Sequence, residues 1–577
     1  MTDPDLLCRL AEQALTAGRA DIAGDILRAV ADPGTPERFH ADGLKLLQAD
    51  RPLDAERSLR LAVRGRPGTA AWHDHLGVAL AQQGRLAEAA ATFRLALRLD
   101  PTAADIAGHF LQICLDTGPL AEAEVAIAGL SAPGPLWQQL GLHHAAAGRF
   151  ADAVRCLGEH TRLAPDSAEG FANLAAAHGK LKQWAAAAEA GRRAVELNPA
   201  NAAGWSNLGN ALRDLGRLPE AVEALTTGMT ADPANADNPA NLGLTLVMLD
   251  RVEEALPVYD RAVALRPDNA EVRFNRAVAR LAAGDWAGGW PEYEWRWRTE
   301  QMRTARRSFP VPEWDGSDPR GRTILVHGEQ GIGDTLQFAR LLKPLADRGA
   351  TVLLDAAPAV RPLLRDSLVG VEVLEGTAVR RTIHAHVPLM SLPHRLGLTD
   401  PDRLPGAVPY LRAPADRIDY WRRRLSELPG RKVGIVWQGN PTHVGDRWRS
   451  VRLSQFAPLA AVPGVTLVGV QKGAGRDQLA DAPFPLVDLG AELADDWADT
   501  AGLLGALDLL VSVDTAVVHL AGALGRPAWV LLPLNADWRW LRHRADTPWY
   551  SSLRLFRQER FGDWSEVFER VADALGS

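Results

Sequence analysis

The sequence predicts an α-helical solenoid in its first half, followed by two α/β halves that each hold a parallel sheet. Alanines and prolines recur at one constant spacing in the first half, which is typical of stacked helical repeats. In the second half, short apolar runs alternate with helical segments, which is typical of parallel sheets covered by helices. With 577 residues, the chain is long enough for several domains with full cores.

The repeat spacing is 34 residues, except for the step from Ala123 to Ala153, which is 30. This pattern resembles the tetratricopeptide repeat, whose helix pairs stack into a superhelix with a concave binding face. We predict that the segment 131–135 (SAPGP) cuts one helix short and explains the four missing residues. The residues in register are Ala55, Ala89, Ala123, Ala153, Ala187, Ala221 and Ala255, with Pro67, Pro101, Pro165, Pro199, Pro233 and Pro267. Segments 3–33 and 269–293 resemble capping repeats.

Such arrays rarely perform chemistry and usually hold polypeptides, so we expect a protein partner on the concave face. The net charge of −7 and the absence of a basic run argue against nucleic acid as a partner. No run of apolar residues is long enough to span a membrane, and the first residues (MTDPD) lack the features of a signal peptide, so we predict a cytoplasmic protein. Cys8, Cys114 and Cys156 show no metal-ligand spacing and are interpreted as core residues in a reducing compartment.

A change in composition marks the end of the repeats. The segment 286–297 holds four tryptophans, and the polar, turn-rich stretch after it ends the 34-residue rhythm. We therefore expect the solenoid to cover residues 1–298 and a linker to cover 299–321. The tryptophans either stack on a sugar or nucleobase or dock one domain against another, and we favour docking.

From Arg322 onward the sequence predicts two halves, 322–428 and 429–577. In such sheets, ligands bind beyond the carboxyl ends of the strands. The expected strands are 323–327, 351–354 and 371–374 in the first half, and 432–437, 465–470, 507–513 and 528–532 in the second.

A glycine-rich loop follows the first expected strand and contains Gly331, Gly333 and Asp334. Glycines let a backbone approach a ligand, and the helix that follows favours an anion at its N-terminus. The loop has neither the dinucleotide-binding order of glycines nor the Gly-Lys-Ser/Thr of nucleotide triphosphatases. Asp334 fits two roles equally: a capping residue of that helix, or a general base beside an acceptor hydroxyl.

Polar residues also follow the strands of the second half, and they are Trp437, Gly439, Asn440, Gln471, Lys472, Asp514 and Thr515. Lys472 is one of few lysines in an arginine-rich chain and stands where a cation would reach a phosphate. His519 lies one helical turn after Thr515 and is either a phosphate neighbour or a buried structural histidine. Arg447 and Arg449 are either phosphate ligands or surface residues.

The string Asp514-Thr515-x-x-x-His519-Leu-Ala-Gly522-Ala-Leu-Gly525-x-Pro527 resembles the donor-nucleotide motif of the heptosyltransferase family. That resemblance covers most of residues 322–575 and implies two Rossmann-like halves in the GT-B arrangement, with a nucleotide-sugar donor. It also implies that Asp334 is the catalytic base. The fusion to repeats resembles bacterial repeat-containing glycosyltransferases, including those that glycosylate flagellin.

The resemblance implies a metal-independent enzyme, because basic groups and helix dipoles neutralise the leaving phosphate. No cofactor is expected, and His384 and His386 lack a third ligand in the sequence. The residues expected to bind the donor are Gly331, Gly333, Trp437, Gly439, Asn440, Arg449, Gln471, Lys472, Asp514, Thr515, His519 and Gly522.

Three functions remain open from the sequence. The first is a glycosyltransferase that modifies Ser or Thr of a protein held by the repeats, and we favour it. The second is a glycosyltransferase of lipid-linked or surface polysaccharide assembly, for which no basic amphipathic helix is visible. The third is a repeat scaffold whose transferase half has no activity.

Overall fold

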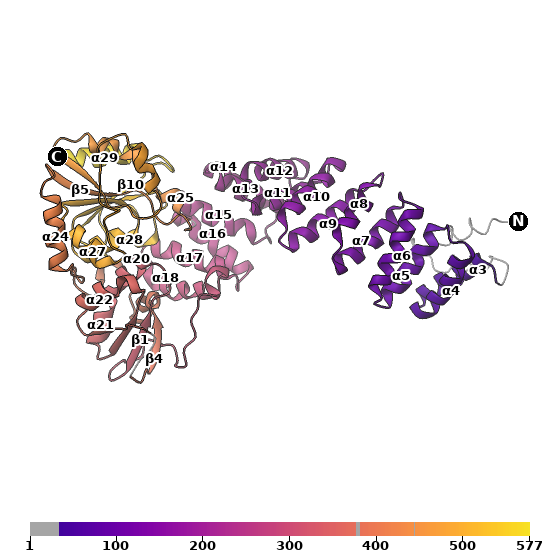
Figure 1. The fold of residues 1–577 in the computed structure, drawn as a ribbon, viewed down its shortest axis with the longest axis horizontal. Helices are drawn as coiled ribbons and strands as arrows, with labels where there is room; N and C mark the ends of the chain where they lie inside the picture. Colours follow the sequence, from indigo (N-terminus) through magenta and orange to yellow (C-terminus); the bar gives the residue numbers. More distant parts are fainter. Residues whose placement is uncertain (1–33, 377–380, 444) are drawn as a thin grey trace. The chain divides into compact units, whose positions relative to one another are not determined.

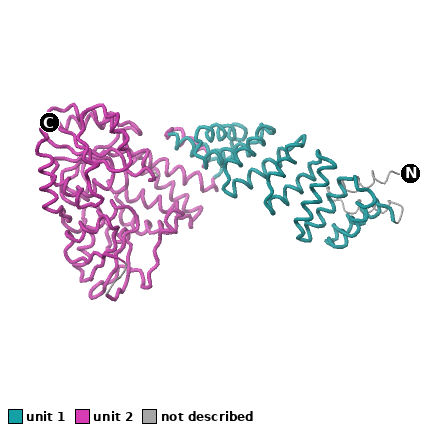
Figure 2. The backbone as a smooth tube through the Cα atoms, viewed as in Figure 1, with its two compact units in different colours: residues 1–215, 230–232 teal, residues 216–229, 233–577 magenta. Residues whose placement is uncertain are grey.

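The computed structural model describes residues 34–376, 381–443 and 445–577. The chain divides into one compact unit of residues 1–215 and 230–232 and a second of residues 216–229 and 233–577 (Figure 2). The expected capping segment 3–33, with Cys8, lies outside the described residues.

The first unit consists of helix pairs, as the repeat spacing predicts (Figure 1). Each alanine in register is almost completely buried, with an exposed fraction of at most 1%. We attribute this burial to the close packing of the paired helices, which leaves little room for a larger side chain. The helices are α3 Pro36–Gln48, α4 Pro52–Gly65, α5 Ala70–Gln82, α6 Leu86–Leu99, α7 Ala104–Thr117, α8 Leu120–Ala128, α9 Gly134–Ala146, α10 Phe150–Leu163, α11 Ala168–Lys180, α12 Trp184–Leu197 and α13 Ala202–Asp214.

The predicted short helix is confirmed. Helix α8 has 9 residues, whereas α6 and α10, the second helices of the neighbouring repeats, have 14 each. The preceding turn passes through Gly118, whose φ of 105° is a left-handed conformation that glycine adopts without strain. The step of 30 residues therefore reflects a shortened repeat within an otherwise regular array.

Replacing Ala89 by leucine is expected to lower the free energy of unfolding by about 1–3 kcal/mol, because the added atoms overfill a helix crossing. Ala91 lies on the same helix but is exposed, so Ala91→Leu should change it by less than about 0.5 kcal/mol. Urea unfolding followed by far-ultraviolet circular dichroism measures both. Equal effects of the two substitutions would contradict the conclusion that Ala89 is closely packed between two helices.

The second unit begins with the last repeats, whose helices are α14 Leu218–Ala231, α15 Asp237–Met248, α16 Val252–Leu265, α17 Ala270–Ala282 and α18 Trp286–Tyr293. Trp286 and Trp290 on α18 are buried and belong to the same hydrophobic core as the α/β part. The ring of Trp286 lies 5.6 Å from that of Trp549, and the ring of Trp290 lies 5.1 Å from that of Trp538. The docking interpretation of these two tryptophans is confirmed, and the boundary between the compact units falls within the repeats rather than after them.

Both sheets are entirely parallel, in the orders β3-β2-β1-β4 and β10-β9-β8-β5-β6-β7. In the first sheet, for example, Val326 of β1 pairs with Leu354 of β2. The strands are β1 Thr323–His327, β2 Thr351–Asp355, β3 Val371–Val373 and β4 Ala385–Pro388, then β5 Arg431–Val436, β6 Val465–Gly469, β7 Val487–Asp488, β8 Leu509–Val513, β9 Ala528–Leu532 and β10 Leu553–Arg557. The sequence analysis missed β4, β7 and β10.

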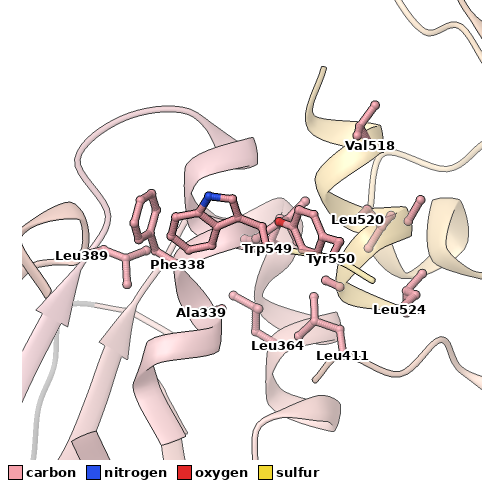
Figure 3. Packing of buried hydrophobic residues seen from close by; sticks show 14 of the residues in the cluster. Phe338, Ala339, Leu364, Leu389, Leu411, Val518, Leu520, Leu524, Trp549 and Tyr550 are labelled. Carbon is pink, nitrogen blue, oxygen red and sulfur yellow. The ribbon is translucent and has the colours of Figure 1, made fainter. Parts of the chain in front are cut away.

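Helices cover these sheets, and an apolar layer joins the two halves (Figure 3). In that layer, Phe338 of the first half lies beside Trp549, while Leu520 projects from α28 of the second half. Helix α24, which precedes β5, packs against α27 of the second half. The main helices are α20 Ile332–Phe338, α21 Leu342–Asp347, α22 Arg361–Ser367, α24 Ala415–Leu425, α27 Trp497–Ala506, α28 Ala516–Ala523 and α29 Ser565–Gly576. Among the described residues, no helix combines the length and apolar character needed to cross a membrane.

Candidate functional site

The two α/β halves meet where α20 and α28 begin. A Cβ atom on Gly333 would lie 3.1 Å from Cδ2 of His519 and 3.3 Å from Cα of Ala516. Glycine at position 333 therefore allows the loop of the first half to approach the first turn of α28 closely. The structure thus brings together two sequence-predicted segments, the glycine loop and the segment from Thr515 to His519.

Asp334 has a partner for each carboxylate oxygen. Its Oδ2 accepts a hydrogen bond of 2.8 Å from the backbone N–H of Gly331, which closes the first turn of α20. Its Oδ1 accepts a charge-assisted hydrogen bond from Nη2 of Arg539, so the carboxylate also links the two halves. The capping interpretation is confirmed, and the role of Asp334 as a general base stays a prediction.

Arg539 is a site residue that the sequence analysis missed. Its buried guanidinium also donates to Oε1 of Gln337 at 2.8 Å and to Oδ1 of Asp537 at 2.9 Å. It lies over the ring of Trp538, 4.6 Å from the ring centre. Burial alone would lower the pKa of Arg539, but the carboxylates of Asp537 and Asp334 raise it above its usual value. The sequence signal that could have identified Arg539 is its position after the carboxyl end of β9, because β9 lies next to β8 in the sheet and ligands bind at strand ends.

His519 is buried and neutral. Burial first, and then the charge of Arg539, lower the pKa of His519 to about 3. Its ring stacks on Trp540 at 5.3 Å, and its Nδ1 lies 3.1 Å from the hydroxyl oxygen of Tyr550. An imidazole in this state offers a ligand a neutral hydrogen bond and no positive charge. The surroundings of His519 therefore agree with the interpretation of a buried structural histidine.

Asp514 and Thr515 stand at the carboxyl end of β8. Burial and the neighbouring charge of Asp537 raise the pKa of Asp514 to about 6. Thr515 is the N-cap residue of α28, but its side chain makes no hydrogen bond to the first-turn amides and lies 3.2 Å from Oγ of Ser512. The first turn of α28 therefore has no side-chain cap.

Trp437 and Gln471 hold the neighbouring loops in place. Trp437 is buried in the core, and its Nε1 donates to the carbonyl of Gly475 at 3.0 Å. Oε1 of Gln471 accepts hydrogen bonds of 3.1 Å from the backbone N–H groups of Trp437 and Gln438. Its Nε2 donates to three carbonyl groups, so every polar atom of this side chain is engaged by the protein itself.

Lys472 does not reach the junction of α20 and α28. Its Nζ donates to the carbonyls of Leu493 and Ala494, at 3.2 and 2.6 Å, and to Oδ1 of Asp495 at 2.9 Å. The lysine charge is thus directed to the loop before α27. A phosphate would have to displace Asp495 to bind there.

Three other predicted residues have local structural roles. A Cβ on Gly439 would lie 2.6 Å from Oδ1 of Asp446 and 2.8 Å from Nη2 of Arg449, so glycine lets this ion pair approach the loop. Asn440 is exposed, and its Oδ1 accepts the backbone N–H of Thr442 at 3.0 Å. A Cβ on Gly522 would lie only 2.4 Å from Cγ of Tyr550, so this glycine permits the packing of α28.

A pocket of about 550 Å³ lies beside the loop after β5 and the loop after β10. Its aromatic wall includes Trp448 and Phe561, whose ring centres are 4.8 Å apart, and Arg447 stacks on Trp448. The lining residues are Gln438, Asp446, Arg447, Trp448, Ser450, Val451, Arg452, Gln455, Gln478, Gln558, Phe561, Gly562 and Trp564.

The two histidines near β4 do not converge on a common point. Nδ1 of His384 accepts the backbone N–H of Thr323 at 2.9 Å, whereas Nδ1 of His386 lies 3.2 Å from Nε2 of His327.

Comparison with known proteins identifies the repeats by residue range and adds one relative that matches about half of the chain. A family model described as tetratricopeptide repeat matches residues 40–104, 139–202 and 241–293, and a second model with that description matches residues 190–223. Protein FlbA of Caulobacter vibrioides is 30% identical over 331 residues, which are 53% of this chain and 54% of that protein. The chain thus spans about half the length of this relative.

Solved structures similar to this chain include TTC0263, a thermophilic repeat protein of Thermus thermophilus, at 22% identity and a TM-score of 0.27, over 30% of this chain and 95% of that one. YrrB, described as a repeat protein with an unusual peptide-binding site, is 23% identical with a TM-score of 0.25, over 37% of this chain and 95% of that one. Together with the buried alanines in register, the matched family models show that the helix pairs of this chain are tetratricopeptide repeats.

Proposed function

We propose that the α/β part is a glycosyltransferase of the GT-B type, which transfers a sugar from a nucleotide-sugar donor to Ser or Thr of a protein held by the repeats. The observation that carries this proposal is the junction of α20 and α28, where Asp334 and Arg539 link the two halves beside the first turn of α28. Parallel sheets bind ligands at the carboxyl ends of their strands, and β1, β8 and β9 all direct polar residues to this junction.

The donor would place its phosphates at the first turn of α28. Backbone N–H groups there have no side-chain cap, and the N-terminal end of a helix attracts anions. Arg539 adds a guanidinium, which suits phosphate oxygens because its N–H groups form a planar fork. Charge on the leaving phosphate would thus be compensated by groups of the chain itself.

Asp334 would accept the proton of the acceptor hydroxyl. In the structure, its Oδ1 is paired with Arg539, so a donor phosphate and the Asp334 carboxylate would compete for the Arg539 guanidinium. An anionic donor that draws Arg539 away would leave the carboxylate free to act as a base. The repeats would supply the acceptor polypeptide, which is the usual role of such arrays. Flagellin is the acceptor class suggested by the resemblance of the sequence.

The proposal is tested by incubating the purified chain with a panel of nucleotide sugars and a bacterial lysate, then measuring mass shifts of protein Ser and Thr residues. We expect one nucleotide sugar to give a hexose- or heptose-type shift on a protein. Label found only on lipid or polysaccharide, or on no product at all, would contradict the protein acceptor or the transfer activity, respectively.

Arg539→Met is expected to lower the transfer rate by about 10²- to 10³-fold, the effect of removing one preorganised charge-stabilising donor. Arg544 in the same loop pairs with Asp546 and Asp402 instead, at 2.7 and 3.3 Å, so Arg544→Met is a matched control that should keep the rate. Rates are compared at saturating donor. Equal transfer rates in the two variants would contradict the proposed role of Arg539 in binding the donor phosphates.

A further inference from the structure

Three potential metal ligands meet where the shortened repeat (α7 and α8) packs against the next repeat (α9 and α10). Glu124 of α8, His144 of α9 and Cys156 of α10 each offer one ligand atom, and these atoms all lie within 4.8 Å of one another. Nε2 of His144 lies 3.7 Å from Oε1 of Glu124. Among the described residues, no other group of three His, Cys, Asp or Glu side chains meets in this way.

The imidazole of His144 is buried, with 4% of the residue exposed, and its Nε2 has no hydrogen-bond partner. Buried polar atoms in proteins are nearly always paired, so an unpaired nitrogen beside a carboxylate, in a cluster that also holds a thiol, requires an explanation. Cys156 is fully buried and forms no disulfide bond. A bound cation would give the unpaired nitrogen a partner.

We propose that Glu124, His144 and Cys156 form a binding site for a divalent zinc-type metal ion. Sulfur, imidazole nitrogen and carboxylate oxygen are the donors that zinc binds, at about 2.0–2.3 Å. Ligand atoms at those bond lengths in a tetrahedron lie roughly 3.3–3.6 Å apart. The separation of 3.7 Å is close to this value, and the widest separation, at most 4.8 Å, has to shorten by up to about 1.5 Å. Water would complete the fourth position.

Binding requires two proton movements. The Cys156 thiol releases its proton to solvent when sulfur bonds to the metal. Nδ1 of His144 now accepts a hydrogen bond of 3.0 Å from Nε of Arg149, which leaves the ring proton on Nε2. Metal binding at Nε2 moves that proton to Nδ1, where Oδ2 of Asp152 lies 3.8 Å away and becomes its acceptor once Arg149 withdraws.

Arg155 would compete with a metal ion for the carboxylate of Glu124. Its Nη2 donates to Oε1 of Glu124 at 2.7 Å and lies 3.5 Å from Oδ1 of Asp152, so a guanidinium holds the carboxylate in the metal-free chain. A cation that binds Glu124 competes with this contact. Replacing Arg155 by glutamine removes the competing charge and should therefore strengthen metal binding.

The test uses the untagged 577-residue chain, stripped with a chelator and titrated with Co²⁺ and then Zn²⁺. We expect binding of one ion per chain, with a thiolate-to-cobalt charge-transfer band in the near ultraviolet that Zn²⁺ removes. Cys156→Ser should abolish the band, whereas Cys114→Ser, at another buried cysteine of the array, should keep it. Arg155→Gln should tighten binding by about tenfold, the effect of roughly 1.4 kcal/mol.

Glu124→Gln provides a second variant, in case Cys156→Ser does not fold, and should weaken Co²⁺ binding by at least about tenfold. Far-ultraviolet circular dichroism shows whether each variant keeps its helices. Absence of the band in the wild-type chain, or its persistence in folded Cys156→Ser, overturns the site. Unchanged Co²⁺ affinity in folded Glu124→Gln would likewise overturn Glu124 as a ligand, and equal affinities of the wild type and Arg155→Gln would contradict the competition between Arg155 and the metal.

Discussion

Replacing Asp334 by asparagine is expected to lower the rate of sugar transfer by about 100- to 10,000-fold, the effect of losing a general base. The asparagine side chain keeps an oxygen that accepts the Gly331 N–H, and it caps helices about as well as aspartate. It cannot accept a proton. Transfer to the protein acceptor, measured at saturating nucleotide sugar, gives the rate, and calorimetry gives the melting temperature.

Asp537→Asn is the matched control for this experiment, because Asp537 is the other carboxylate partner of Arg539. Both variants weaken the charge pairing of Arg539, but only Asp334→Asn removes the proposed base. We expect a much smaller loss of rate in Asp537→Asn. If the two variants lose the same activity, the loss of charge pairing with Arg539, rather than the loss of a proton acceptor, explains the effect. A stable Asp334→Asn variant with full activity would show that Asp334 is not the general base.

Replacing Trp290 by alanine is expected to lower the free energy of unfolding of the second unit by about 3–5 kcal/mol, the range for truncating a buried tryptophan. Its ring is buried and meets those of Trp286, Phe338 and Trp538, so truncation leaves a cavity between α18 and the α/β part. Denaturant unfolding of the full chain, followed by tryptophan fluorescence, measures the loss.

Trp295→Ala is the control for the same segment. Trp295 is half-buried and contacts the guanidinium groups of Arg273 and Arg298, each 4.4 Å from its ring centre. Contacts of this kind at a partly exposed site contribute about 0.5–1 kcal/mol. A loss in Trp290→Ala no larger than in Trp295→Ala would contradict the shared core.

The repeats were predictable from sequence because every unit places a small residue at the same helix crossing, so the constraint recurs at a constant spacing. The strands β1, β2 and β9 were predictable because they are short, continuous apolar runs. β10 was missed because Arg554 and Arg557 interrupt its apolar residues, so it is not a continuous apolar run, and β4 was missed because it is short and ends in Pro388.

The candidate site was predictable only in part. The positions of Asp334, Thr515 and His519 followed from the rule that ligands bind at strand ends. Arg539 was missed because its link to Asp334 joins residues 205 positions apart and leaves no local pattern. The burial of Trp437 follows from the alternation of strand side chains, because Val433, Ile435 and Trp437 point to the same buried face.

The core that α18 shares with the α/β part has a practical consequence for exchanging repeats between proteins of this design. A chimaera joined at residue 298 would combine the Trp286 and Trp290 of one parent with the Trp538 and Trp549 of another, and foreign rings rarely interlock in a close-packed interior. A junction before α13, near residue 200, keeps these rings from a single parent and leaves the helix pair α13–α14 intact. The last repeats should therefore be inherited together with the α/β part, while the repeats before them are free to be replaced.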